Sequence, residues 1–129
     1  MNRKTLIAGS ILGLTAVVLG AFGSHILEAI ITKDSMETFW IGIRYQIYHA
    51  LLLLFVGATD KISRDSKKLI FVVITIGIIL FSGSLYGLAT KELTGIDFKI
   101  VGFITPIGGI LLIVSWIIML LDFLKLKEE

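Results

Sequence analysis

Four long apolar stretches, joined by polar segments of about ten residues, dominate the pattern of this chain. Residues 5–27, 69–90 and 100–121 contain no Asp, Glu, Lys or Arg, and residues 38–59 contain only Arg44. A helix needs about 20 residues to cross a hydrocarbon core of about 30 Å. The stretches do not alternate between polar and apolar residues as the strands of a membrane barrel do. The pattern therefore predicts four transmembrane helices, over about 5–24, 38–59, 69–90 and 100–121.

The short connections indicate how these helices are arranged. Consecutive helices joined by so few residues lie next to each other and run antiparallel. We therefore expect an all-α membrane protein, an up-down-up-down bundle that forms a single domain over residues 1–129. The composition agrees, because 56% of the residues are hydrophobic and only 17% are charged, whereas a soluble domain of this length carries more charge.

The beginning of the chain imitates a signal peptide. Asn2-Arg3-Lys4 precedes the apolar run Leu6–Leu19, and Ala21-Phe22-Gly23 resembles a cleavage site. The apolar stretch is longer than the core of a usual signal peptide. We therefore expect this segment to be retained as the first transmembrane helix.

The Lys and Arg residues are divided unevenly between the two ends of the predicted helices. Eight of the 12 lie in the N-terminus, the connection between the second and third helices, and the C-terminus, whereas three lie in the other two connections. Lys and Arg are enriched in the cytoplasmic loops of membrane proteins. We therefore expect both termini on the cytoplasmic side of the membrane.

The first connection, residues 24–31, admits two interpretations. His25 and Glu28 lie three residues apart, with Ile and Leu between them. This spacing suits a short helical extension that lies at the outer interface of the membrane. It suits equally well a first helix that continues beyond the bilayer.

Small residues recur at a spacing of four within the predicted spans. Such pairs let helix backbones approach each other closely in lipid. We expect them to mark packed helix surfaces, and the pairs are Gly9 with Gly13, Ala16 with Gly20, Gly83 with Gly87, and Thr105 with Gly109.

The second stretch contains the most unusual residues of the chain, the hexapeptide Arg44-Tyr45-Gln46-Ile47-Tyr48-His49. A charged side chain is costly in hydrocarbon and normally faces a bundle interior, a partner or water. On a helical projection, one aliphatic stripe remains for lipid, formed by Trp40, Ile43, Ile47 and Leu51. We therefore expect neighbouring helices to cover Arg44 and the other polar residues.

With both termini cytoplasmic, the unusual polar residues of all four spans fall in the outer half of the bundle. Pro106 frees the carbonyl of Gly102 and favours a kink, although an ordinary kink satisfied by a nearby hydroxyl explains this proline as well. The candidate polar cluster, a pocket or a network, consists of Arg44, Tyr45, Gln46, Tyr48, His49, His25, Ser82, Ser84, Tyr86, Thr105 and Pro106.

Four segments in this order, together with Trp116, carry a resemblance: Gly20–His25, Arg44–Leu51, Phe81–Tyr86 and Thr105–Gly109. The chain resembles the small four-helix membrane proteins of the YgdD/YwdK type, a domain-of-unknown-function family with a eukaryotic relative associated with mitochondria. The resemblance covers nearly the whole chain and departs at Ser24, where members usually have Ala. It implies a multi-pass protein of the bacterial plasma (inner) membrane, with no established activity and no catalytic residues.

Metal binding and catalysis find little support in the sequence. His25 and His49 are the only histidines and there is no cysteine, whereas a tight transition-metal site uses three or four N, O or S ligands. Ser82 or Ser84 beside His49 would supply a nucleophile and a base, but no carboxylate lies within the spans to orient the histidine. We therefore expect no metal, no cofactor and no enzyme activity.

Two interpretations of the polar cluster remain. In the first it is a pocket, in which Arg44 holds an anionic group and His49 takes up a proton. Such a pocket suits an accessory or lipid-binding protein, or alternatively a transporter or channel for a small solute or ion. In the second it is a staple, in which Arg44 pairs with Glu37 or Glu28 and the other residues bond between helices.

The expected partners lie in the membrane. A formal net charge of +2 is too small to indicate nucleic-acid binding, whereas lipid, a membrane-protein partner and a second copy of the chain all remain open. A solvated loop explains the basic residues of the second connection as well as lipid binding does. The candidate contacts for anionic lipid there are Lys61, Arg64, Lys67 and Lys68.

Overall fold

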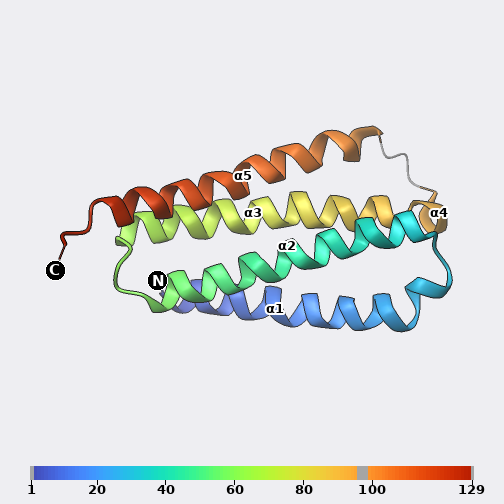
Figure 1. Cartoon of the computed structure of the whole chain (residues 1–129), viewed down its shortest axis with the longest axis horizontal. Helices are drawn as coiled ribbons and strands as arrows, with labels where there is room; N and C mark the ends of the chain where they lie inside the picture. The colour runs from blue at the N-terminus through green and yellow to red at the C-terminus, as the bar shows by residue number, and fades with distance from the viewer. Residues whose placement is uncertain (1, 96–98, 129) are drawn as a thin grey trace.

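The computed structural model describes residues 2–95 and 99–128 (Figure 1). Its four long helices are α1 (Asn2–His25), α2 (Lys33–Ala58), α3 (Arg64–Ala89) and α5 (Lys99–Leu124). A short 3-10 helix, η1 (Leu27–Ala29), follows α1, and a single helical turn, α4 (Lys91–Thr94), follows α3. The predicted all-α fold with four transmembrane helices is confirmed, because all four helices are long and apolar enough to cross a membrane.

The helices are longer than the spans that the sequence pattern predicts. α2 begins at Lys33 and α3 at Arg64, each about five residues before the predicted span. A charged residue ends a hydrocarbon-crossing segment, but it does not end a helix. The 26 residues of α2 measure about 39 Å, which exceeds a hydrocarbon core of about 30 Å. The helix ends therefore extend into the headgroup layers.

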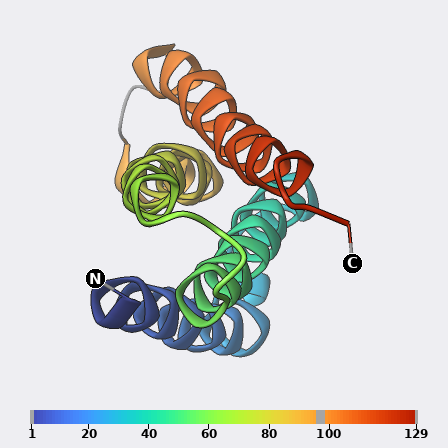
Figure 2. The same ribbon diagram turned by 90° about the vertical axis from the view of Figure 1, so that its left-hand side faces the viewer.

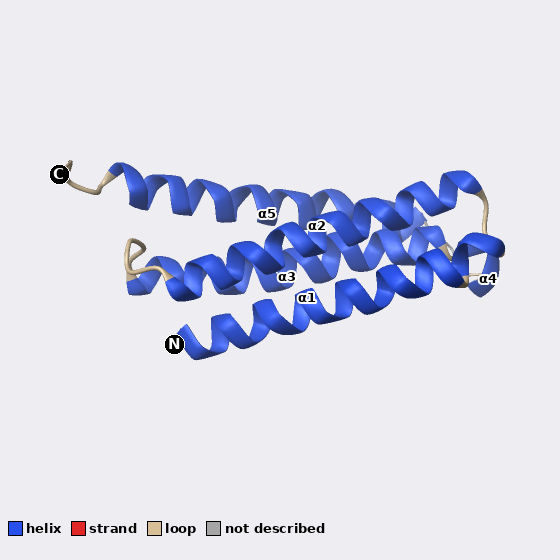
Figure 3. Cartoon of the chain, turned by 60° about the horizontal axis from the view of Figure 1, so that its bottom comes forward, coloured by secondary structure: helices blue, strands red, loops and turns tan. Residues whose placement is uncertain are grey.

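The long helices form an open row in the order α1, α2, α3, α5. Each packs against its neighbour in the chain, and within the described residues the backbones of α1 and α5 do not approach each other. α2 and α5 meet only through side chains, such as the rings of Phe55 and Phe123, whose centroids lie 6.3 Å apart. Figure 2 shows the row from one end, with α1 and α5 at its two extremes. Helices account for nearly all of the described chain (Figure 3).

Two names are used below for the ends of the molecule. The termini end holds the start of α1, the connection between α2 and α3, and the end of α5 (Figure 1). The opposite end holds η1 and α4 (Figure 1).

Hydrogen bonds from side chains explain where α2 and α3 begin. Thr32 Oγ1 accepts the backbone N–H of Ser35 at 3.1 Å, and Ser63 Oγ accepts the backbone N–H of Ser66 at 3.2 Å. Asp122 of α5 also accepts the Ser63 backbone N–H and the Ser66 hydroxyl, both at 2.8 Å. A carboxylate is favourable at a helix N-terminus. Asp122 therefore ties the end of α5 to the start of α3.

Two clusters of buried apolar side chains lie along the row. The cluster of the termini half includes Leu53, Val56, Ile70 and Ile74 of α2 and α3. The cluster of the opposite half includes Leu27 of η1, which is only 1% exposed and packs with residues of α2 and α3. The first connection therefore contains a short helical segment, η1, which follows directly on α1 and is anchored in the core through Leu27.

Glycines permit several close contacts between helices, of which two lie beside α3. A Cβ at Gly108 would lie 2.5 Å from the backbone nitrogen of Phe81 and 2.8 Å from the carbonyl oxygen of Gly77, so α3 and α5 touch there through their backbones. A Cβ at Gly42 would lie 2.6 Å from the ring of Tyr86. Of the small residues singled out in the sequence, Gly83 has nothing within 4 Å. Gly9, by contrast, is packed as its spacing predicted, since a Cβ there would lie 2.9 Å from the carbonyl oxygen of Ala50 of α2. The spacing therefore identified some packed positions but not all of them.

We expect Gly108→Ala to lower the free energy of unfolding by about 1–3 kcal/mol, because overpacking against rigid backbone forces the helices apart. The matched control is Gly102→Ala on the same helix, where nothing lies within 4 Å of the added methyl group. The control should leave stability unchanged or slightly raised, since Ala favours helix more than Gly does. Reversible unfolding in detergent micelles measures both, and equal stabilities of the two variants would contradict this packing.

Candidate functional site: polar residues within the spans and at the termini end

Gln46 links three helices through hydrogen bonds. Its side chain is 4% exposed, and Nε2 donates to the carbonyl oxygen of Leu12 and to Thr15 Oγ1, both at 2.8 Å. Its Oε1 accepts the hydroxyl of Tyr86 at 2.6 Å. Both amide N–H groups and the amide oxygen are therefore used, and they join α2 to α1 on one side and to α3 on the other.

The serines of α3 also bond between helices. Ser82 is buried, and its hydroxyl donates to the carbonyl oxygen of Gly42 at 2.7 Å. Ser84 donates to the carbonyl oxygen of Phe81 at 2.8 Å, and its hydroxyl lies 2.5 Å from Thr105 Oγ1 of α5. In hydrocarbon, a hydroxyl without a partner is costly. These serines therefore connect α3 to α2 and to α5.

Both ring nitrogens of His49 are occupied. Nδ1 lies 2.8 Å from the carbonyl oxygen of Tyr45, and Trp116 Nε1 donates to Nε2 at 3.1 Å. A carbonyl oxygen only accepts and an indole N–H only donates, so Nδ1 carries the proton and Nε2 carries none. A proton added at Nε2 would face the indole N–H and break this bond. The geometry therefore assigns His49 a neutral, bridging role between α2 and α5.

These bonds decide what the candidate cluster can do chemically. Ser82 Oγ is bonded to a backbone carbonyl, and His49 Nε2 is bonded to Trp116. The serine–histidine pair considered from the sequence is therefore not formed. Within the described residues there is also no group of three His, Cys, Asp or Glu side chains that could hold a metal ion.

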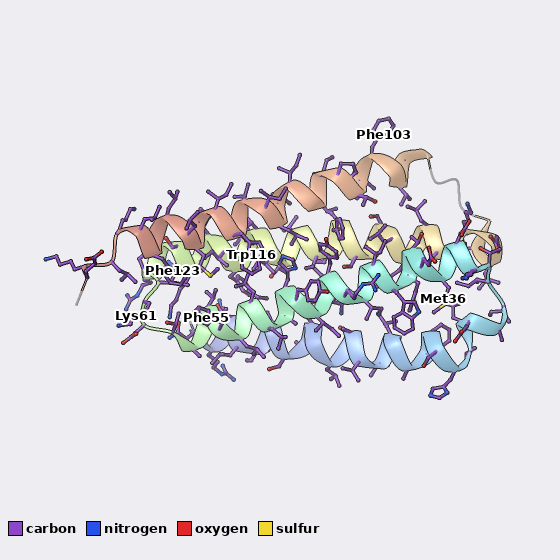
Figure 4. The ribbon with its side chains drawn as sticks, viewed as in Figure 1. Met36, Phe55, Lys61, Phe103, Trp116 and Phe123 are labelled. Atoms are coloured by element: carbon purple, nitrogen blue, oxygen red, sulfur yellow. The ribbon has the colours of Figure 1, made fainter. Side chains whose placement is uncertain are left out.

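An aromatic cleft lies between α2 and α5, with α3 as its floor. Its volume is about 300 Å³. The ring of Tyr45 packs against Phe81 of α3, with centroids 4.9 Å apart, and against Tyr48, with centroids 5.7 Å apart. Figure 4 shows Trp116 in the central part of the molecule and Phe103 pointing away from it. The lining residues are Tyr45, His49, Phe81, Gly109, Leu112, Ile113 and Trp116.

Arg44 is exposed on the surface of the chain, which corrects the expectation that neighbouring helices cover it. The face of α2 around it is also exposed, with Tyr48 at 52% and Leu51 at 60%. Ile43, expected on the lipid side, is buried instead. The physical reason is that α1 packs on the face of α2 that the helical projection had left for lipid. The side chain of Gln46 lies between α1 and α3. No hydrogen bond or ion pair joins Arg44 to the described residues, Glu37 included.

The remaining members of the predicted cluster separate from one another. His25 is exposed at the end of α1, and Pro106 is exposed within a continuous α5. Tyr86 lies on the Gln46 side of α2, where it also packs against Phe39 with ring centroids 5.3 Å apart. Two residues of the network were missed as candidates, Thr15 and Trp116. The sequence did offer a signal for both residues, because a polar group within an apolar span must find a hydrogen-bond partner there.

At the termini end, the basic residues divide among three hollows. Arg64 and Lys67 line a cavity of about 610 Å³ together with Asn2 and Arg3 of α1. Lys61 lies in a separate hollow of about 260 Å³, near the labelled Phe55 and Phe123 in Figure 4. Lys68 lines a third, groove-shaped hollow of about 240 Å³ between α1 and α3.

The fold and these contacts define a small multi-pass membrane protein whose buried polar side chains bond helix to helix. The chain belongs to the family described as protein of unknown function (DUF423), whose model matches residues 19–109. It is 40% identical to the UPF0382 membrane protein YwdK of Bacillus subtilis, over 93% of this chain and 95% of that protein. It is 35% identical to the UPF0382 inner membrane protein YgdD of Escherichia coli K12, over 99% of this chain and 95% of that protein. No solved structure matches.

These comparisons confirm the resemblance to the YgdD/YwdK type and the location in a membrane. The family is one of unknown function, and its description assigns no activity.

We expect Gln46→Leu to lower the free energy of unfolding by about 2 kcal/mol, because three interhelical bonds of about 0.6 kcal/mol each are lost. Tyr86→Phe removes one of the three and should lower it by about 0.6 kcal/mol. Tyr48→Phe, on the exposed face of α2, is the matched control and should have no effect. Unfolding in detergent measures all three, and a loss no greater for Gln46→Leu than for Tyr86→Phe would disprove the three-helix link.

We expect His49 to populate the neutral form with the proton on Nδ1. The carbonyl of Tyr45 and the indole of Trp116 fix this tautomer. Nitrogen NMR of the labelled imidazole distinguishes a protonated from an unprotonated ring nitrogen. Trp116→Phe removes the donor to Nε2 but leaves the Tyr45 carbonyl, which should keep the proton on Nδ1. A dominant proton on Nε2 in the unmodified protein would contradict the assignment.

Proposed function

We propose that this protein binds an anionic phospholipid of the outer leaflet at the exposed face between α2 and α5. In this proposal both termini are cytoplasmic, as the distribution of basic residues favours. The phosphate of the lipid contacts Arg44, and an acyl chain lies in the aromatic cleft. The observation that carries the proposal is a guanidinium within a membrane-spanning helix that no described residue of the chain pairs.

The position of Arg44 along α2 supports a contact with a headgroup. Arg44 follows Lys33, the first residue of α2, by eleven residues, or about 16 Å. Because both ends of α2 extend beyond the hydrocarbon core, the side chain starts about 12 Å below the headgroups and reaches toward them. A guanidinium binds phosphate through two parallel hydrogen bonds. An anionic headgroup drawn toward Arg44 therefore offsets the cost of its charge.

The surroundings of Arg44 support an apolar rather than a polar continuation of the ligand. Tyr45, next to Arg44, forms one wall of the cleft, and Phe81 forms the floor. The two helices beside the cleft are bridged only by side chains, so the cleft opens laterally toward lipid. Its volume of about 300 Å³ lies at the lower end of the range for small-molecule sites.

The contacts inside the row give no support to transport or catalysis. Gln46 and His49, the two buried polar residues of the hexapeptide, are fully used between helices. Conduction of a solute or a proton needs polar groups that exchange partners along a path. The unpaired charge lies on the surface instead, so the proposal is a binding function and not an enzymatic one.

We expect Arg44→Gln to weaken the binding of phosphatidylglycerol by about tenfold, because one charge-assisted phosphate contact is lost. Gly109→Val should weaken it similarly: a Cβ there lies 3.6 Å from Phe81, so a larger side chain fits and occupies the cleft. Native mass spectrometry of the purified protein with phosphatidylglycerol or phosphatidylcholine measures retention of the lipid.

Lys33→Gln and Gly102→Val are matched controls. The first removes a positive charge at the start of the same helix, and the second adds the same side chain to an open position of α5. Both should bind as the unmodified protein does. Equal loss in Arg44→Gln and Lys33→Gln would overturn the proposal. So would a co-purifying membrane protein, in place of lipid, whose retention depends on Arg44.

A further inference from the structure

The cavity at the termini end, lined by Asn2, Arg3, Arg64 and Lys67, is called the basic cavity here. It lies between the start of α1 and the start of α3, at the level of Thr59, which is 15 residues or about 22 Å from Arg44 along the axis of α2. Three of its four lining residues are cationic and none is acidic. Its volume is about 610 Å³, which is large enough for a small-molecule ligand.

Lys67 gives this cavity a buried charge. Its side chain is 6% exposed, and Nζ donates to Asn2 Oδ1 and to the carbonyl oxygen of Thr59, at 3.1 and 2.5 Å. Both acceptors are neutral, although the C-terminus of α2 at Thr59 contributes a partial negative charge. A buried ammonium without a counter-ion is costly. An anion in the basic cavity would supply the missing charge.

Arg3 and Arg64 complete the cavity from two different helices. Both are exposed, and no hydrogen bond or ion pair joins either of them to the described residues. Among the described residues, the cavity lining contains no acidic side chain, and Asn2 is its only neutral one. The geometry thus brings three positive charges to one hollow, and nothing described in the chain neutralises them.

The neighbouring hollow shows that this arrangement is not a general property of a basic membrane surface. Lys61 and Lys125 line it together with Asp60 and Asp122. Positive and negative side chains therefore balance there, two against two. The same end of the molecule holds one neutralised hollow and one that carries only positive charge.

A groove next to the basic cavity continues between α1 and α3. It has a volume of about 240 Å³ and is lined by Lys4, Thr5, Lys68, Phe71 and Val72. Phe71 and Val72 lie one to two turns further into the span than Arg64 and Lys67. Lysine side chains at such a position keep the charge at the interface while their stems cover apolar surface. The groove therefore combines basic residues with the apolar side chains of Phe71 and Val72, which suit an acyl chain.

We propose that the basic cavity binds a phospholipid whose headgroup carries two phosphates, of the diphosphatidylglycerol class, with an acyl chain in the groove. Three cations in the cavity and two in the groove exceed what one phosphate neutralises, and basic pockets between helices at the cytoplasmic face suit such headgroups. The site is separate from the Arg44 face and does not depend on the function proposed for it.

The test uses the full chain, purified in a mild detergent, and native mass spectrometry with added lipid. The probes are diphosphatidylglycerol, phosphatidylglycerol and phosphatidylcholine, with inorganic pyrophosphate as a free anion. We expect the unmodified protein to retain one diphosphatidylglycerol with about tenfold preference over phosphatidylglycerol. The double variant Arg3→Gln, Arg64→Gln should lose that preference, and it leaves the buried Lys67 and its bonds in place.

The double variant Lys61→Gln, Lys125→Gln is the matched control. It removes the same charge from the same end of the molecule, but from the neutralised hollow, and should retain diphosphatidylglycerol as the unmodified protein does. Equal losses in the two double variants would overturn the site, because the binding would then be a diffuse surface effect. Displacement of the lipid by equimolar pyrophosphate would overturn the lipid assignment. Arg44→Gln should leave this binding unchanged, which separates it from the function proposed above.

Discussion

The cost of leaving a buried polar group without a partner governs the packing around α2, and the amide of Gln46 avoids that cost by bonding to two neighbouring helices at once. The hydroxyl of Thr75 in α3 is a buried group for which no partner is found. In water a lost hydrogen bond is replaced by a bond to solvent, but in hydrocarbon it is not. Gln46 must therefore keep Leu12, Thr15 and Tyr86 within reach. That condition fixes the rotation of α2 about its axis. Once the rotation is fixed, His49 faces α5 and Arg44 faces outward.

The same rotation of α2 also determines which of its polar side chains bond between helices and which lie on the surface. The polar side chains that point between helices are used there, as the bonds of Ser82, Gln46 and His49 show. What remains available for a ligand is on the surface: Arg44 on one flank of the row and the basic cavity on another. In both binding proposals the ligand therefore reaches the protein from the plane of the membrane or from its surface. The interior of the row is a scaffold.

The positions of the helices along the chain were predicted well from the sequence. The face that each helix buries against its neighbours was predicted poorly. Runs without charge define spans, because burial in hydrocarbon excludes charge whatever the neighbours are. Which face of a span is covered depends on the neighbouring helices, and a projection of one helix does not contain them. Ile43 thus looked exposed and is buried, whereas Arg44 looked covered and is exposed. Gly83 and Gly108 were equally small in the sequence, and only Gly108 touches a backbone.

The open row explains why the two candidate ligand sites lie where they do. In a closed bundle of four helices every helix has two neighbours, and no groove remains between second neighbours. In a row, α1 and α3 share the flank of α2, and α2 and α5 share the flank of α3. The basic cavity lies in the first of these grooves, where Lys67 reaches the end of α2 at Thr59. The aromatic cleft lies in the second, where Phe81 of α3 forms the floor. Each groove is exposed to lipid because the helix that would close it is absent from that flank. The arrangement of the helices, rather than any single motif, therefore produces the two hollows on which the binding proposals are based, one on each flank of the row.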